Sequence, residues 1–183
     1  AWIAQMEFDE ENLEAALAAC ERARDLALYE PRPWFLLSRI RIELGEEDAS
    51  EEARKRFLEL DRVTQDVRSL ESKLGYDPHQ PLLWQQIAQL RSSVGDIKRS
   101  RAALGRLIRL DPLSLDYRVV SLKILEAAGD KEGALAMAQG LETNCGDQLQ
   151  AWKELELFYG RMRDRVNQVR CGERFLRMQA SGD

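Results

Sequence analysis

The 183-residue sequence lacks strand signals, long apolar runs and clustered cysteines. Neither an alternating β-branched run nor an Asn-Gly hairpin turn occurs, which argues against a sheet. No run of about 18 apolar residues occurs, so we expect no membrane insertion. The cysteines, Cys20, Cys145 and Cys171, are far apart and odd in number. Their spacing argues against a disulfide framework and a zinc site, and it favours a reducing compartment. With no signal-like amino end, the predicted location is the cytoplasm.

Groups for catalysis are also scarce. The single histidine, His79, lies in the loop sequence DPHQP without a marked partner. No metalloprotease, phosphate-loop, nucleophile-elbow or dinucleotide motif is present. Paired carboxylates such as Glu46 and Glu47 fall where a helix begins, and there they favour the helix dipole. The sequence therefore predicts a protein that is not an enzyme and has neither a cofactor nor a metal site.

The charge is unevenly distributed along the chain. Residues 1–80 carry 11 basic and 19 acidic side chains, whereas residues 81–183 carry 16 and 13, within a net charge of -5. Opposite charges on the two halves make head-to-tail self-association one hypothesis, and a homo-oligomer is therefore one expected state.

Most of the chain shows the apolar periodicity of helices. From Leu13 to Leu28 the apolar residues recur at intervals of about three and four, which is typical of one face of a helix. Gly45, Gly95 and Gly129 each follow such a run, where a left-handed residue ends a helix. Asp96 and Asp130 come next and are suited to capping the following helix. The pattern predicts antiparallel helix pairs joined by short loops.

The turn glycines, the capping aspartates and the tryptophans recur with one period. Gly95 to Gly129 spans 34 residues, as do Asp96 to Asp130 and Asp130 to Asp164, and Trp84 to Trp152 spans twice that length. A repeat of this length indicates stacked helical units.

A 34-residue helix–turn–helix with glycine, aspartate and tryptophan at these positions resembles the tetratricopeptide repeat. Trp34, Trp84 and Trp152 match the tryptophan of the first helix, and Ala88 and Tyr159 match its small and aromatic positions. The resemblance implies an all-α, right-handed α-solenoid of antiparallel helix pairs. The expected units are a degenerate half-repeat over 1–30, a repeat with an extended second helix over 31–80, and repeats over 81–114, 115–148 and 149–183, in one continuous domain.

Several positions depart from the repeat pattern: Leu122 and Glu156 stand where small residues are expected, and Gly146 stands where a proline is expected. Arg118 stands where the tryptophan of the repeat over 115–148 is expected, and Arg163 replaces the turn glycine of the last repeat.

One stretch exceeds the period. Trp34 to Trp84 spans 50 residues, which is 16 more than the period, and no glycine or proline interrupts residues 46–74. An apolar stripe continues through this stretch at steps of three and four: Leu60, Val63, Val67, Leu70 and Leu74. We predict a second helix of about 24 residues over 49–74. Its stripe either packs inside the protein or contacts a partner.

A helical-repeat array of this family binds partners on the concave face of its first helices. The resemblance places ten residues on that face: Phe35, Arg39, Gln85, Gln89, Ser92, Val119, Lys123, Lys153, Leu157 and Arg161. This mixture suits an extended peptide or a helix, including one of acidic character. The subclass that clamps a terminal carboxylate uses lysine and asparagine, and the corresponding positions here, Phe35, Arg39, Gln86, Asp116 and Val120, lack both.

Basic residues gather in two of the expected repeats. They are Arg91, Lys98, Arg99, Arg101, Arg106 and Arg109 in one, and Arg161, Arg163, Arg165, Arg170, Arg174 and Arg177 in the last. Such patches meet RNA phosphates or acidic proteins, but the absence of interleaved aromatics makes nucleic acid the lesser option. The function predicted is a protein–protein interaction scaffold or adaptor, and an RNA-associated adaptor is the alternative.

Overall fold

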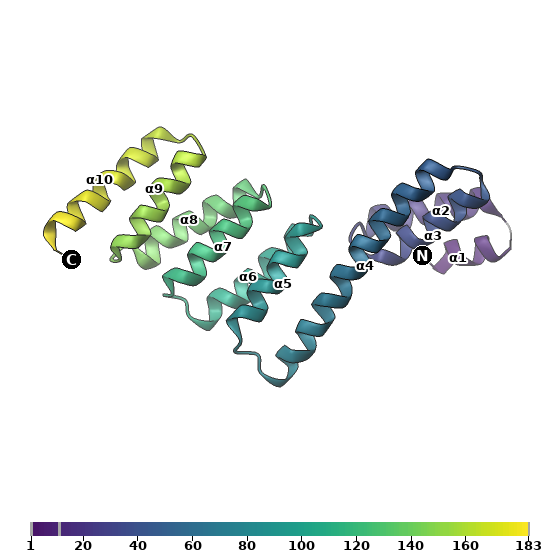
Figure 1. Ribbon diagram of the computed structural model, residues 1–183, viewed down its shortest axis with the longest axis horizontal. Coiled ribbons are helices and arrows are strands. Elements are labelled where there is room, and N and C mark those ends of the chain that lie inside the picture. Colours follow the sequence, from purple (N-terminus) through teal and green to yellow (C-terminus); the bar gives the residue numbers. More distant parts are fainter. Residues whose placement is uncertain (1, 11, 183) are drawn as a thin grey trace. The chain divides into compact units, whose positions relative to one another are not determined.

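The computed structural model describes residues 2–10 and 12–182, and those residues form helices and connecting loops without a strand (Figure 1). In chain order the helices are α1 (Trp2–Asp9), α2 (Leu13–Leu26), α3 (Pro31–Glu43), α4 (Glu47–Tyr76), α5 (Pro81–Ser93), α6 (Ile97–Leu110), α7 (Leu115–Ala127), α8 (Lys131–Cys145), α9 (Leu149–Arg161) and α10 (Arg165–Ser181). The predicted all-α class is confirmed.

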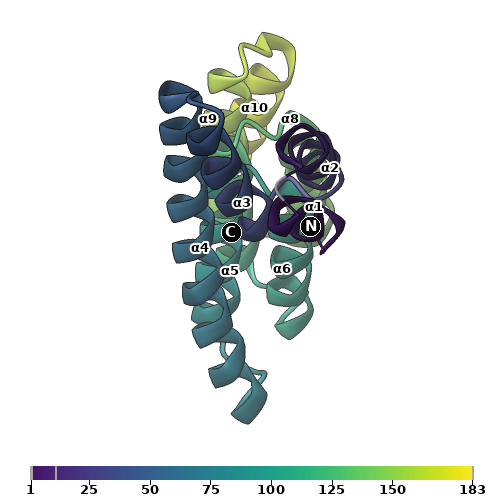
Figure 2. The same cartoon turned by 90° about the vertical axis from the view of Figure 1, so that its right-hand side faces the viewer.

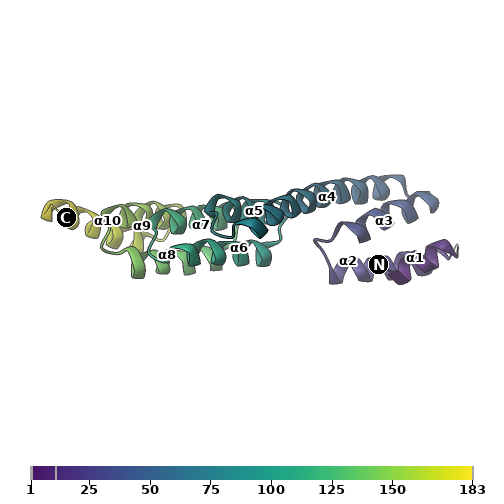
Figure 3. The same cartoon turned by 90° about the horizontal axis from the view of Figure 1, so that it is seen from below.

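The chain divides into two compact units, of which the first ends at Tyr76 and the second begins at Asp77. In the first unit α1 packs on α2, α2 on α3, and α3 on α4. Its core contains Ala16, Cys20, Leu37 and Ile40, which are fully buried. The second unit consists of the pairs α5/α6, α7/α8 and α9/α10, and Figure 3 shows α5 and α7 on one side with α6 and α8 on the other. The repeat ranges themselves remain predictions.

The first helices of the repeats share one hydrogen bond. In each case the tryptophan indole Nε1–H donates to the carbonyl oxygen six residues earlier: Trp34 to Leu28 at 3.2 Å, Trp84 to Pro78 at 3.0 Å and Trp152 to Gly146 at 2.8 Å. The bond ties the loop before the helix to its first turn. It therefore fixes where the chain enters each repeat.

Arg118 makes the same bond with a different side chain. Its Nε and Nη2 donate to the Pro112 carbonyl oxygen, again six residues earlier, at 3.2 and 2.7 Å. The guanidinium is buried beside Gly140 of α8, where an added Cβ would lie 2.7 Å from Arg118 Nη1. A missing side chain at Gly140 thus makes room for the arginine, and the repeat register is kept without the tryptophan.

The turns between paired helices are also equivalent. Gly95 and Gly129 have φ angles of 86° and 71°, and Arg163 occupies the same place with φ 58°. Asp96, Asp130 and Asp164 follow, and each carboxylate accepts from the backbone N–H three residues later, at 3.2, 3.0 and 3.1 Å. The predicted glycine turns and the aspartate caps at positions 96 and 130 are confirmed.

The helix predicted over 49–74 is longer than expected. α4 is one helix of 30 residues, seen without interruption in Figure 2, and it contains the 16 residues that exceed the repeat period. Of its apolar stripe, Leu60, Val63, Val67 and Leu74 are buried and Leu70 is half-buried. Binding of a partner along this stripe remains a prediction.

Arg163 allows a test of the turn geometry. Because a left-handed conformation costs a non-glycine residue about 1 kcal/mol, Arg163→Gly should raise the free energy of unfolding by about that amount. Urea denaturation measures the change. Gly129→Ala is the matched control and should lower the free energy of unfolding by a similar amount. Equal stability of Arg163→Gly and the native chain would contradict a left-handed conformation at Arg163.

Candidate protein-binding groove

A hollow of about 460 Å³ lies between the first helices of two successive helix pairs in the second unit. Its walls come from α5 and α7, and its lining combines amides, hydroxyls and aliphatic groups: Gln85, Gln89, Ser92, Ser93, Val120, Lys123, Ile124, Ala127 and Ala128. Gln85 and Gln89 are one helical turn apart and therefore share a face of α5. The site is polar along one wall and mainly aliphatic along the other.

Four of the ten residues expected in the groove line this hollow, namely Gln85, Gln89, Ser92 and Lys123. Val119 does not line it, and Val120 does. The lining positions of α7, 120, 123, 124 and 127, follow helical spacing, and Val119 lies about 100° round the helix from Val120. Val120, Ile124 and Ala127 were not among the ten expected residues, and the role of Val119 remains a prediction.

The other expected residues of the second unit lie on α9. Leu157 is 46% exposed. Lys153 Nζ is 3.0 Å from Glu156 Oε2 and lies over the Phe175 ring. Arg161 Nε and Nη2 donate to the two carboxylate oxygens of Glu126 on α7, at 3.0 and 2.7 Å.

Lys123 is paired as well, with its Nζ 3.5 Å from Glu154 Oε2. The three expected groove cations of the second unit, Lys123, Lys153 and Arg161, therefore all have carboxylate partners. Partnered cations attract an acidic ligand less than free ones, so the positive character expected from the sequence is largely neutralised.

Phe35 and Arg39 belong to the first unit. The Phe35 ring packs against Phe57 with centroids 5.2 Å apart, and the Arg39 guanidinium lies 4.8 Å from the centroid of the Phe8 ring. Both side chains are exposed on α3, so they form a surface of that unit. They do not take part in the hollow between α5 and α7.

Ion pairs between successive helix pairs neutralise much of the basic character seen in the sequence. Arg101 of α6 binds Asp130, the cap of α8, and Arg170 of α10 binds Glu142 of α8, with Nη2 2.9 Å from Oε2. Hydrogen bonds from these guanidinium groups hold the pKa of both the Asp130 and the Glu142 carboxyls below their ordinary values. The partners are 29 and 28 residues apart, so a local count of charges could not find them.

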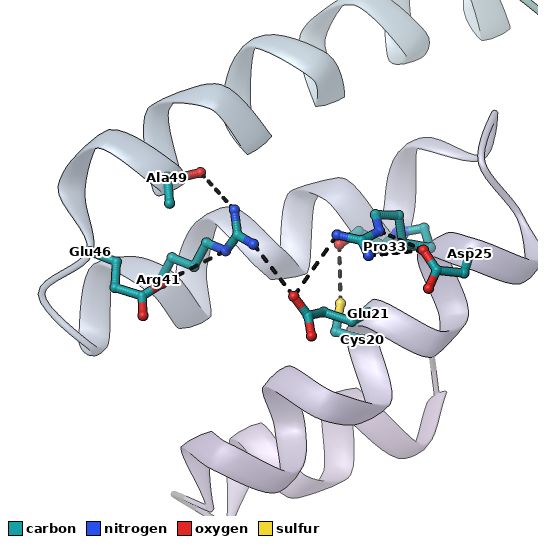
Figure 4. A network of polar contacts seen from close by, with 8 residues as sticks. Cys20, Glu21, Asp25, Pro33, Arg41, Glu46 and Ala49 are labelled. Atoms are coloured by element: carbon teal, nitrogen blue, oxygen red, sulfur yellow. Dashed lines mark hydrogen bonds and ion pairs between the residues drawn. The ribbon is translucent and has the colours of Figure 1, made fainter.

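The cysteines are structural. Burial raises the pKa of Cys20 to about 11 and raises the pKa values of Cys145 and Cys171, so their thiolates are disfavoured. The Cys20 thiol donates to the Pro33 carbonyl oxygen at 3.1 Å (Figure 4).

The single histidine, His79, is exposed, and its Nδ1 lies 4.0 Å from Asp77 Oδ1. Across residues 2–10 and 12–182, His, Cys, Asp and Glu form no cluster able to hold a metal ion.

Helices of the described part of the chain are all too short or too polar to cross a bilayer.

Comparison with known proteins gives only remote likenesses. No protein-family model and no curated protein matches the chain. A crystal structure of MamA is 13% identical, covering 98% of this chain and 96% of that one, with a TM-score of 0.45. A second, of MamA protein, is 14% identical, covers 97% and 88%, and has a TM-score of 0.43. The MamA RS-1 ArsTM double mutant is 12% identical, covers 99% and 93%, and has a TM-score of 0.47.

The two interhelical ion pairs make stability depend on pH. Because the folded-state pKa values of Asp130 and Glu142 are lowered, the pairs stabilise the fold fully above about pH 5 and lose this effect as the pH falls through 4. The double variant Arg101→Gln/Arg170→Gln should therefore be less stable than the native chain at pH 7, and the difference should shrink towards pH 3. Urea unfolding across this range measures it. A difference that is the same at both ends contradicts the role of the pairs.

Proposed function

We propose that the protein is a non-catalytic scaffold that binds an extended segment of a partner protein along α5 and α7. The observation that carries this proposal is the open hollow in which Gln85 and Gln89 face an aliphatic wall of Val120, Ile124 and Ala127. A glutamine amide offers one donor group and one acceptor, the same pair that a peptide backbone presents. The aliphatic wall offers a place for apolar side chains.

The spacing of the two amides supports an extended ligand. Residues four apart on a helix are separated by a rise of about 6 Å, whereas every second residue of an extended strand is separated by about 6.6 Å. Gln85 and Gln89 can therefore reach backbone groups that point to the same side of one bound strand. The side chains of such a strand project perpendicular to these backbone groups and alternate between its two faces, so one alternate set can pack against the aliphatic wall of α7.

An RNA-associated function has less support. Six of the arginines that suggested it are paired with carboxylates: Arg91 and Arg99 with Asp96, Arg101 with Asp130, Arg161 with Glu126, Arg170 with Glu142, and Arg177 with Glu173. Phosphate binding by these six arginines would require breaking their pairs. A steep fall of RNA binding with salt would favour that alternative.

The groove is tested with partners captured from the native host by the whole chain. Gln85→Ala/Gln89→Ala should weaken capture of a groove partner at least tenfold, because two hydrogen bonds to the ligand, each worth about 1 kcal/mol, are lost. Quantitative mass spectrometry against the native chain measures the loss. Gln139→Ala, an exposed glutamine on α8, is the control and should leave capture unchanged.

A second measurement separates backbone recognition from side-chain recognition. The bound segment is made as a peptide with N-methyl groups on alternate amides. One alternation should bind as well as the unmodified peptide and the other much more weakly. Equal binding of the two N-methylated peptides contradicts the proposal. Undiminished capture of the partner by Gln85→Ala/Gln89→Ala contradicts it as well.

A further inference from the structure

A larger hollow, of about 700 Å³, lies in the first unit, apart from the groove residues of α5 and α7. It is enclosed by the start of α1, the second half of α2 and the start of α3, and its lining includes Trp2, Ile3, Leu26 and Pro33. Trp2 is 78% exposed and Leu26 is 90% exposed, so bulky apolar groups stand open to solvent around it. A second, smaller hollow also borders Trp2 and extends the concave surface to Phe35.

Two arginines at this hollow make no ion pair with the described residues. Arg22 of α2 and Arg32 of α3 both line it, both are exposed, and neither makes a hydrogen bond or ion pair with residues 2–10 or 12–182. Glu30 also lines the hollow, so its lining carries two positive side chains and one negative side chain. The rim is therefore positive in a unit whose sequence is acidic overall.

Two neighbouring arginines, unlike Arg22 and Arg32, are bound to carboxylates. Arg24 Nε donates to Asp25 at 2.9 Å, and Arg41 lies 3.5 Å from Glu21, as Figure 4 shows for Arg41. Arg41 also donates to the Ala49 carbonyl oxygen at 3.2 Å. Glu21 of α2 is thus engaged by Arg41 of α3, and Asp25 by Arg24 of its own helix. Arg22 and Arg32 remain available to an external group.

We propose that this hollow binds a short peptide segment of a partner protein in which acidic residues adjoin bulky apolar ones. Tryptophan and arginine are the side chains most enriched where proteins bind each other tightly. The apolar side chain would pack against Trp2, Ile3 and Leu26, and the carboxylate would accept paired hydrogen bonds from Arg22 or Arg32. The site is separate from the groove proposed above and its existence does not depend on that groove.

A peptide selection with the whole chain tests this proposal. Random 12-residue peptides are enriched on the native chain, and their binding is then compared with that to Arg22→Gln/Arg32→Gln, in which only the charge is removed. The enriched peptides should combine Asp or Glu with Phe, Leu or Ile, and should bind the variant at least tenfold more weakly. Arg106→Gln/Arg165→Gln removes two exposed charges elsewhere and should leave the binding unchanged.

Tryptophan fluorescence then locates the peptide. Trp2 is the exposed member of the four tryptophans, so a bound peptide without tryptophan should shift the emission to the blue, and Trp2→Phe should abolish that shift. Circular dichroism checks that each variant is folded. The proposal is overturned by peptides lacking acidic residues, by undiminished binding to Arg22→Gln/Arg32→Gln, or by no enrichment at all. Concentration-dependent dimerisation lost in Trp2→Phe would also overturn it, because a second copy would then cover the hollow.

Discussion

One kind of hydrogen bond sets the register of the repeats. It runs from a side chain in the first turn of each pair's first helix to the carbonyl oxygen six residues earlier. Trp34, Trp84 and Trp152 make it with an indole and Arg118 makes it with a guanidinium. Each bond holds the incoming loop against the first helical turn, which fixes the rotation of that helix about its axis. The faces that meet the next helix, and those that face solvent, follow from this rotation.

The pairing of charges between repeats determines which groups remain for binding. Asp130 caps α8 through its carboxylate and also receives Arg101 from α6, so one residue ends a turn and joins two helix pairs. Glu126 and Glu142 receive Arg161 and Arg170 in the same way. Once these cations are engaged, the hollow between α5 and α7 presents mainly amides, hydroxyls and aliphatic groups. Arg22 and Arg32, which line the hollow of the first unit, make no such pair with the described residues.

The sequence predicted the local features well, because they depend on a few consecutive residues. Gly95, Gly129 and the aspartates after them were identified from the backbone conformation and the caps that short turns require. The uninterrupted α4 followed from the lack of glycine and proline over 46–74. Which neighbour on α7 faces the hollow, Val119 or Val120, depends on how helices rotate against one another, and periodicity alone does not fix that angle. Pairs such as Arg170 with Glu142 depend on the same packing.

The account is tested most directly at Arg118, where the shared bond is made without a tryptophan. Replacing Arg118 by Met keeps the length of the side chain but leaves the Pro112 carbonyl without its donor, which should lower the free energy of unfolding by about 2 kcal/mol. Arg118→Trp restores an indole donor and should retain most of the native value. Urea denaturation of both variants gives the comparison. An Arg118→Met variant as stable as the native chain, or an Arg118→Trp variant as unstable as Arg118→Met, would contradict the claim that this bond sets the repeat.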